Sequence, residues 1–134
     1  LTYGDGVSDI NLHKLVEFHN SNNGALTMSS VRPFGRFGTF SGNDASQVTE
    51  FMEKPKGDGA AINGGFFVCN PDVFNYISDG DETIFERAPM EELARDGLLY
   101  HYSHNGFWKC MDTLKDKSEL EELYASNKAE WVIW

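Results

Sequence analysis

Strand-like and helix-like segments alternate along the 134 residues of this chain, and this alternation constrains the fold more than any other feature. Helices are predicted where apolar residues recur at helical spacing or a capping residue precedes them, and strands where apolar residues run together or alternate. The predicted capping residues are Asn11, Asn70 and Thr113, the last with Asp116 three residues on, and a polar turn is predicted at residues 41–44. The predicted helices are residues 12–19, 71–77, 89–96 and 114–127, and the predicted strands are residues 1–3, 26–31, 36–40, 48–53, 62–69 and 98–103. A mixture of this kind, in a chain long enough to bury one core, predicts a single layered α/β domain.

The composition excludes two classes of partner. The net charge is −10, whereas nucleic acids and anionic membranes are bound through positive surfaces. No apolar run approaches the roughly 20 residues that span a bilayer, and the first residues do not resemble a secretion signal. We therefore expect a cytoplasmic protein that binds neither nucleic acid nor membrane. Ten phenylalanines fit a well-packed interior or a large interface.

Cys69 and Cys110 are the two cysteines of the chain. Two cysteines in a domain of this size do not form a disulfide framework, so we expect buried free thiols. The four histidines (His13, His19, His101 and His104) lack metal-ligand spacing and are interpreted as surface or hydrogen-bonded residues. Neither a phosphate-binding P-loop nor a serine-nucleophile motif is present.

Two aspartates are candidate metal ligands. Asp5 follows the first predicted strand and is flanked by glycines, a position where open α/β sheets bind ligands. Asp112 follows the aromatic pair Phe107-Trp108 and precedes a helix. Mg²⁺ is commonly held by one or two carboxylates together with phosphate oxygens and water. The alternatives are an Asx-turn at Asp5 and a favourable charge beside a helix N-terminus at Asp112.

Two further segments carry candidate ligand-binding residues. Glu53 and Lys54 stand before Pro55 at a strand end, where they could contact sugar hydroxyls and a phosphate or form an exposed ion pair. The strand at residues 62–69 contains Gly64-Gly65. Adjacent glycines in a strand indicate a close approach of a ligand to the backbone or a β-bulge, and Asn63 beside them could bind the same ligand or satisfy the loop.

The ordered set of motifs resembles that of glucose-1-phosphate cytidylyltransferases, which are sugar-nucleotide pyrophosphorylases. The resemblance rests on residues 3–6, 34–38, 53–59, 62–68, 106–108 and 111–113, and residues 128–131 resemble the end of that family. It covers essentially the whole chain but only the C-terminal half of a family member. It implies the C-terminal part of a Rossmann-like nucleotidyltransferase fold, with a mixed sheet and flanking helices.

The resemblance also implies a reaction and a site. Family members use Mg²⁺ to make CDP-glucose and pyrophosphate from CTP and glucose 1-phosphate, for the deoxysugars of bacterial surface polysaccharide. By motif match, Asp5 and Asp112 would bind Mg²⁺. Gly4, Glu53, Lys54, Asn63 and Gly65 would bind the nucleotide sugar, with Lys54 acting in catalysis.

One part of the family pattern is absent from this sequence. The glycine-rich loop that wraps the triphosphate does not occur here, so we expect the chain alone to be inactive. Activity would then require a homo-oligomer or a separate N-terminal half. The alternative is a non-catalytic domain that binds a sugar phosphate or nucleotide sugar, or that forms oligomers. A metal-dependent glycosyltransferase using Asp79-Gly80-Asp81 is a weaker third hypothesis, because that motif lies apart from the others.

Overall fold

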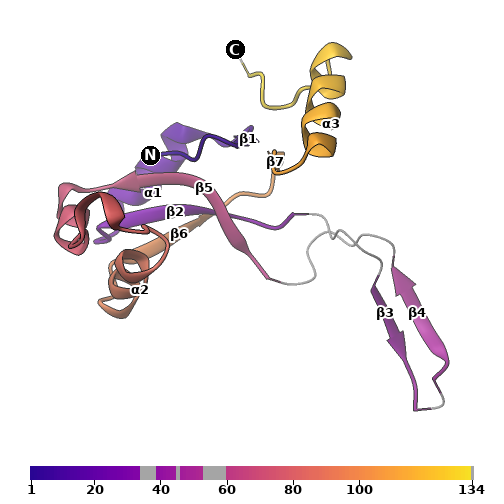
Figure 1. Cartoon of the computed structure of the whole chain (residues 1–134), viewed down its shortest axis with the longest axis horizontal. Helices are drawn as coiled ribbons and strands as arrows, with labels where there is room; N and C mark the ends of the chain where they lie inside the picture. Colours follow the sequence, from indigo (N-terminus) through magenta and orange to yellow (C-terminus); the bar gives the residue numbers. More distant parts are fainter. Residues whose placement is uncertain (34–38, 45, 53–59, 134) are drawn as a thin grey trace.

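A mixed three-stranded sheet forms the centre of the protein (Figure 1). The computed structural model describes residues 1–33, 39–44, 46–52 and 60–133. In the sheet, β2 (Leu26–Val31) lies between β5 (Ile62–Cys69) and β6 (Leu99–Ser103). β2 is antiparallel to β5 and parallel to β6. The predicted α/β architecture with a mixed sheet and flanking helices is therefore confirmed.

Helices cover both faces of β2, which explains why this strand consists of apolar and small residues. On one face Leu26, fully buried, packs with residues of β5, of the short 3₁₀ helix η1 (Pro71–Tyr76) and of α2 (Ala88–Arg95). On the other face Thr27 contacts His19 of α1 (Leu12–Asn20). The core cluster consists of Ala25, Leu26, Phe67, Val73, Met90 and Leu93. A second 3₁₀ turn, η2 (Gly80–Glu82), precedes α2.

The helix ends show where local sequence determines structure and where it does not. Asn11 caps α1 as predicted, since its side chain accepts a hydrogen bond from the backbone N–H of Lys14 at 3.0 Å. Asn70 occupies the predicted N-cap position of η1, but its side chain makes no capping hydrogen bond. The Asn70 side chain instead lies 3.1 Å from the ring of buried His19 and donates to the carbonyl of Gly24, so tertiary partners compete with the capping role.

A second, smaller strand pair lies beside the central sheet. β1 (Gly6–Ser8) is antiparallel to β7 (Trp108–Cys110), and the chain continues from β7 into α3 (Leu114–Ala125). Thr113 and Asp116 form the predicted capping box at the start of α3. Residues 1–3 run along the edge of β5, where Thr2 forms a bridge with Phe66. The strand pair is thus tied to the central sheet through the first residues of the chain.

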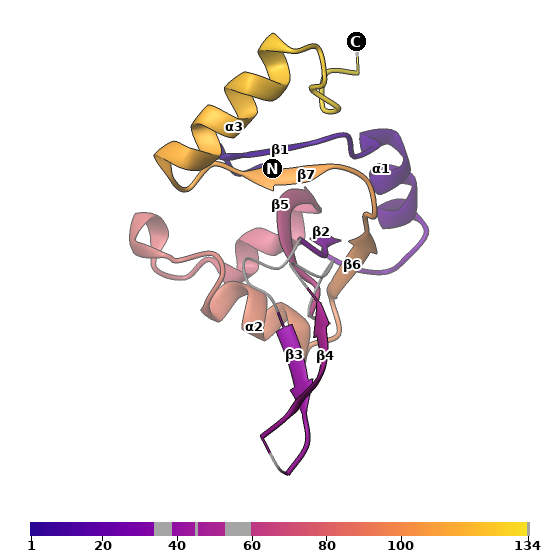
Figure 2. The same cartoon turned by 90° about the vertical axis from the view of Figure 1, so that its right-hand side faces the viewer.

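The hairpin of β3 (Thr39–Gly42) and β4 (Val48–Met52) stands apart from the rest of the chain (Figures 1 and 2). The predicted strand pair is therefore confirmed, but Ser41 and Gly42, which are predicted in the turn, belong to β3. Residues 36–38 and 53 of the predicted strands lie outside the described part. Every residue of β4 is exposed. None of the helices in the described ranges combines the length and apolar character that would let it cross a membrane.

Candidate functional site: a pocket between two strand systems

A pocket of about 240 Å³ lies between the β1–β7 pair and the edge of β5. Its lining comes from three segments that are far apart in the sequence: residues 3–6, residues 62–65 and residues 108–112. Four of the seven predicted site residues line this one pocket, namely Asp5, Asn63, Gly65 and Asp112. Gly4 lies between the lining residues Tyr3 and Asp5, and its predicted contact with a ligand is untested. Glu53 and Lys54 lie outside the described residues.

The β1–β7 ladder brings the two candidate metal ligands to the same end of the strand pair. Gly6 is paired with Cys110, and the N–H of Met111 donates to the carbonyl of Asp5 at 2.8 Å. Asp5 therefore lies one residue before the paired segment on one strand, and Asp112 lies two residues after it on the other. Both carboxylates are exposed and line the pocket.

The donor set at this end suits a hard divalent cation that keeps other ligands. In the described part of the chain, no three acidic, histidine or cysteine side chains gather into a metal cluster. One or two carboxylates are nevertheless the usual protein ligands of Mg²⁺ when phosphate oxygens and water complete its octahedral shell. The chemistry of the two carboxylates on this pocket therefore fits the ion that the sequence predicts.

The thiol of Cys110 also lines the pocket. It donates to a carboxylate oxygen of Asp112 at 3.2 Å. Partial burial, followed by the neighbouring Asp112, raises the pKa of the Cys110 thiol. Raised pKa values keep thiols protonated and unreactive, which argues against a nucleophilic role. Both cysteines are free, as predicted, but the prediction that they are buried is wrong, because Cys69 is exposed and Cys110 is only half-buried.

The opposite wall of the pocket is a glycine bulge in β5. The β2–β5 register shifts here, so that Gly64, Gly65 and Phe66 together face Ser29. Gly65 has φ +78°, a left-handed conformation that favours glycine. A Cβ atom on Gly65 would lie 2.9 Å from the ring of Tyr3, so glycine is also required by packing. The β-bulge interpretation of the glycine pair is thus confirmed, and the bulge lies on the pocket surface.

Hydrogen bonds fix the orientation of Asn63 in this wall. Its Oδ1 accepts from the N–H of Gly65 at 2.9 Å, and its Nδ2 donates to the hydroxyl of Tyr3 at 3.1 Å. The amide group therefore satisfies the loop, one of the two roles foreseen for it. One N–H of Nδ2 and a lone pair of Oδ1 remain beyond these two bonds, so the side chain retains capacity toward a ligand.

Tyr3 joins the pocket to the loop before α2. Burial, together with a hydrogen bond to the carboxylate of Glu86, raises the pKa of Tyr3 to about 12. The same hydrogen bond lowers the pKa of Glu86. The ring of Tyr3 also packs edge-on against Phe67 of the core, with centroids 5.3 Å apart. Tyr3 is thus a neutral hydroxyl that holds Asn63 in place.

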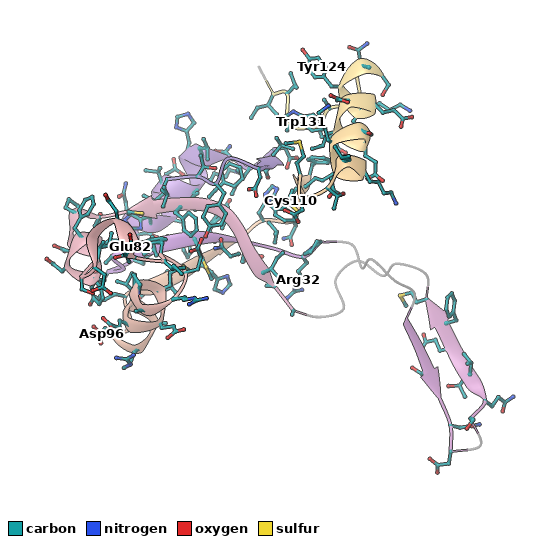
Figure 3. All side chains as sticks on the ribbon, viewed as in Figure 1. Arg32, Glu82, Asp96, Cys110, Tyr124 and Trp131 are labelled. Atoms are coloured by element: carbon teal, nitrogen blue, oxygen red, sulfur yellow. The ribbon has the colours of Figure 1, made fainter. Side chains whose placement is uncertain are left out.

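Tyr3 and Trp108 lie inside sequence motifs, but the sequence alone indicates a role for neither of them. Trp108 lies on β7, lines the pocket and donates its indole N–H to the carbonyl of Gly64 at 2.8 Å. Its position two residues after Gly106, in an aromatic strand that precedes Asp112, is the only sequence signal for this contact. Figure 3 labels Cys110, two residues further along the same strand, between the central sheet and α3.

The histidines do not extend the site. His19 is buried between Thr27 and Asn70, and His101 contacts the hydroxyl of Ser30. The Nε2 atom of His104 lies 2.9 Å from Asp9 and 3.1 Å from the hydroxyl of Ser8. Because both partners of His104 approach the same ring nitrogen, this cluster lacks the geometry of a serine-nucleophile triad. The interpretation of these three as hydrogen-bonded residues is confirmed, and exposed His13 fits the surface interpretation.

Comparison with known proteins defines the class to which this fold and pocket belong. The sequence model of the family described as "Nucleotidyl transferase" matches residues 2–126. The chain therefore belongs to the nucleotidyltransferase family. Among solved structures, it is similar to a putative glucose-1-phosphate thymidylyltransferase from Bacillus anthracis, with TM-score 0.62 and 18% identity over 98% of this chain and 54% of that one. HddC from Yersinia pseudotuberculosis gives TM-score 0.61 and 18% identity over 90% of this chain and 52% of that one.

Sequence relatives are more specific. Glucose-1-phosphate cytidylyltransferase of Salmonella typhi is 48% identical over 133 residues, which are 99% of this chain and 51% of that protein. Probable glucose-1-phosphate cytidylyltransferase of Bacillus subtilis is 40% identical over 134 residues, which are 100% of this chain and 52% of that protein. The chain thus spans about half the length of these curated relatives. The recognition of a nucleotidyltransferase similar to glucose-1-phosphate cytidylyltransferases is confirmed.

Proposed function

We propose that this chain supplies the metal-binding and sugar-phosphate-binding part of a glucose-1-phosphate cytidylyltransferase. The observation that carries the proposal is the pocket, because it collects Asp5, Asn63, Gly65 and Asp112 from three distant segments. Similarity to cytidylyltransferases over essentially the whole chain supports the same conclusion. The substrates would be CTP and glucose 1-phosphate, and the products CDP-glucose and pyrophosphate.

In the proposed reaction, a phosphate oxygen of glucose 1-phosphate attacks the α-phosphorus of CTP in line, and pyrophosphate leaves. Such chemistry depends on positioning and on neutralising the charge of the phosphates. Bound Mg²⁺ would contribute positive charge next to the phosphates. Asp5 and Asp112 would hold the ion, while Asn63 and the backbone at Gly65 would orient the sugar. Glu53 and Lys54 complete the proposal as sugar and phosphate ligands, with Lys54 acting in catalysis.

We propose a division of functions between this chain and the part of its relatives that it does not match, so that this chain does not act alone. It lacks the family's glycine-rich triphosphate loop, so we propose that the chain binds the product nucleotide sugar but does not turn over substrates by itself. Mixing it with the part of the Salmonella typhi protein that it does not match should produce pyrophosphate from CTP and glucose 1-phosphate. Pyrophosphate formation by the chain alone would contradict this division.

Calorimetric titration with CDP-glucose, with and without Mg²⁺, tests the proposed site. We expect binding that depends on Mg²⁺, because the carboxylates and the ligand phosphates share the ion. Asp5→Asn and Asp112→Asn should each weaken the Mg²⁺-dependent binding by about tenfold, or about 1.4 kcal/mol. Asp72→Asn is the matched control, since this exposed aspartate lies on η1 and does not line the pocket. If both pocket variants bind like the parent, the metal assignment is wrong.

The alternative function is a non-catalytic domain that binds a nucleotide sugar or forms oligomers. Large apolar side chains on the hairpin favour the oligomer-forming version, since Phe51 is 63% exposed and Val48 is 54% exposed. Sedimentation of the chain at several concentrations tests self-association. Mg²⁺-dependent binding of CDP-glucose, with no pyrophosphate formed after the unmatched part of the Salmonella typhi protein is added, would support the non-catalytic alternative.

A further inference from the structure

The two walls of the pocket belong to different strand systems. Asp5 and Asp112 extend from the β1–β7 pair, whereas Asn63 and Gly65 belong to the central sheet. A ligand that contacts both walls therefore requires the β1–β7 pair to be held in a fixed position relative to the bulge of β5. The backbone supplies part of this connection, through the N–H of Tyr3 donating to the carbonyl of Gly65 at 2.9 Å.

Trp108 supplies a side-chain connection between the same two walls. Its indole N–H donates to the carbonyl of Gly64 at 2.8 Å, and the two residues are 44 positions apart. Gly64 belongs to the bulge and is not among the residues paired in the β2–β5 register. Its carbonyl therefore receives from Trp108 a hydrogen bond that the regular ladder does not provide there. Gly64 is buried, so an unsatisfied carbonyl there would otherwise cost stability.

Because Trp108 lies on β7, this hydrogen bond is connected to the end of the strand pair that carries Asp5 and Asp112. Trp108 is paired with Ser8, and the same strand pair leads within a few residues to Asp5 on one side and Asp112 on the other. The other end of the hydrogen bond is adjacent to Gly65, whose N–H holds the side chain of Asn63. A shift of the strand pair would thus move the Trp108 donor, the bulge carbonyl and the Asn63 amide together.

We infer that Trp108 is a positioning residue that couples metal binding at Asp5 and Asp112 to nucleotide-sugar binding at the β5 bulge. This inference rests on the proposed function, because it concerns the two ligands of that site. The role is carried by the N–H donor rather than by the bulk of the ring. Trp108 needs no contact with the reacting atoms to act in this way.

The decisive quantity is the ratio of the dissociation constants for CDP-glucose measured without and with Mg²⁺. By linkage, this ratio reports the coupling between the two ligands, and we expect it to be about fivefold or more for the parent chain. Trp108→Phe retains an aromatic ring but removes the donor. We expect this variant to bring the ratio within about twofold of 1. A merely structural role would weaken binding equally with and without Mg²⁺ and leave the ratio unchanged.

Trp131→Phe is the matched control. Trp131 is also half-buried and packs at a tilt against Phe107, with ring centroids 5.2 Å apart, but it does not line the pocket. It lies beside α3 (Figure 3). The control variant should keep the parent ratio, and thermal unfolding of both variants should establish that they are folded. A parent-like ratio in Trp108→Phe, with Mg²⁺-dependent binding intact, overturns this inference alone. A parent chain without Mg²⁺-dependent binding overturns the proposed function and this inference with it.

A second measurement covers the case in which Trp108→Phe does not fold. In the parent chain labelled with ¹⁵N, the indole N–H resonance of Trp108 should shift when Mg²⁺ is added and shift again with CDP-glucose. The indole resonance of Trp131 serves as the internal reference and should stay in place. If the Trp108 resonance moves with neither ligand while CDP-glucose binds, the indole does not report on the site and the inference is wrong.

Discussion

Strands β2 and β4 are built from similar residues but have opposite environments. β2 reads Leu-Thr-Met-Ser-Ser-Val and is buried along nearly its whole length, whereas β4 reads Val-Thr-Glu-Phe-Met and is exposed throughout. Both strands form because β-branched and aromatic residues favour extended backbone. Only β2 has helices on both of its faces. The comparison shows that local sequence determines that a strand forms, while tertiary partners determine whether it contributes to stability.

The largest expected effect is a loss of stability on substitution in β2, the buried strand of this comparison. Leu26→Ala removes a fully buried side chain from β2 and should lower the free energy of unfolding by about 2 to 5 kcal/mol. Phe51→Ala, on the exposed hairpin, removes more atoms but should change stability by no more than about 0.5 kcal/mol. Chemical denaturation of the two variants measures both values. Equal losses would mean that the hairpin packs against another surface in solution.

A smaller loss of stability is expected at Gly65, a glycine of the pocket, and can be compared with the loss at an open glycine elsewhere. Gly65→Ala places a methyl group 2.9 Å from the ring of Tyr3 in a left-handed conformation. Gly97→Ala is the matched control, with φ +72° and no atom within 4 Å of the added carbon. We expect a loss of about 1 kcal/mol for Gly97→Ala and about 2 to 3 kcal/mol for Gly65→Ala. If the two losses are equal, the contact with Tyr3 adds no cost.

Sequence reasoning recovered the features of the site that depend on neighbours along the chain. The bulge follows from two adjacent glycines in a strand, and the caps at Asn11 and Thr113 follow from short-range hydrogen bonds. Features that depend on distant partners were missed or wrong. The side chain of Asn70, at the N-cap position before Pro71, does not cap the helix, because its partners His19 and Gly24 are 51 and 46 residues away in the sequence.

The pocket itself illustrates the same limit. The sequence indicated Asp5 and Asp112 as a pair because each follows a strand end, and the antiparallel ladder placed them together. Nothing local connects Trp108 to Gly64 or Tyr3 to Glu86, since both contacts join segments that are far apart in the sequence and meet only in the folded domain. Residues that contact a ligand can therefore be predicted from motifs more readily than the residues that hold them in place.

The smallest expected effect concerns the pKa of Tyr3, which contacts both the core and the pocket. Tyr3 lies at the edge of the buried sheet, and its pKa is raised to about 12 by burial and by Glu86. Because the folded protein holds this proton more tightly than an unfolded chain with the ordinary value of 10.0 does, the contribution to stability is present below pH 10 and is lost as the pH rises toward 12. An absorbance titration of tyrosinate should therefore show one late step near pH 12. Tyr3→Phe should remove that step.

Tyr76 is the comparison residue, because its pKa is also raised, chiefly by a hydrogen bond to Asp96 at the exposed surface. Tyr76→Phe should leave the step near pH 12 in place. Loss of the late step in Tyr76→Phe, and not in Tyr3→Phe, would show that the hydroxyl in the pocket titrates as an ordinary surface tyrosine and cannot hold Asn63 by remaining neutral.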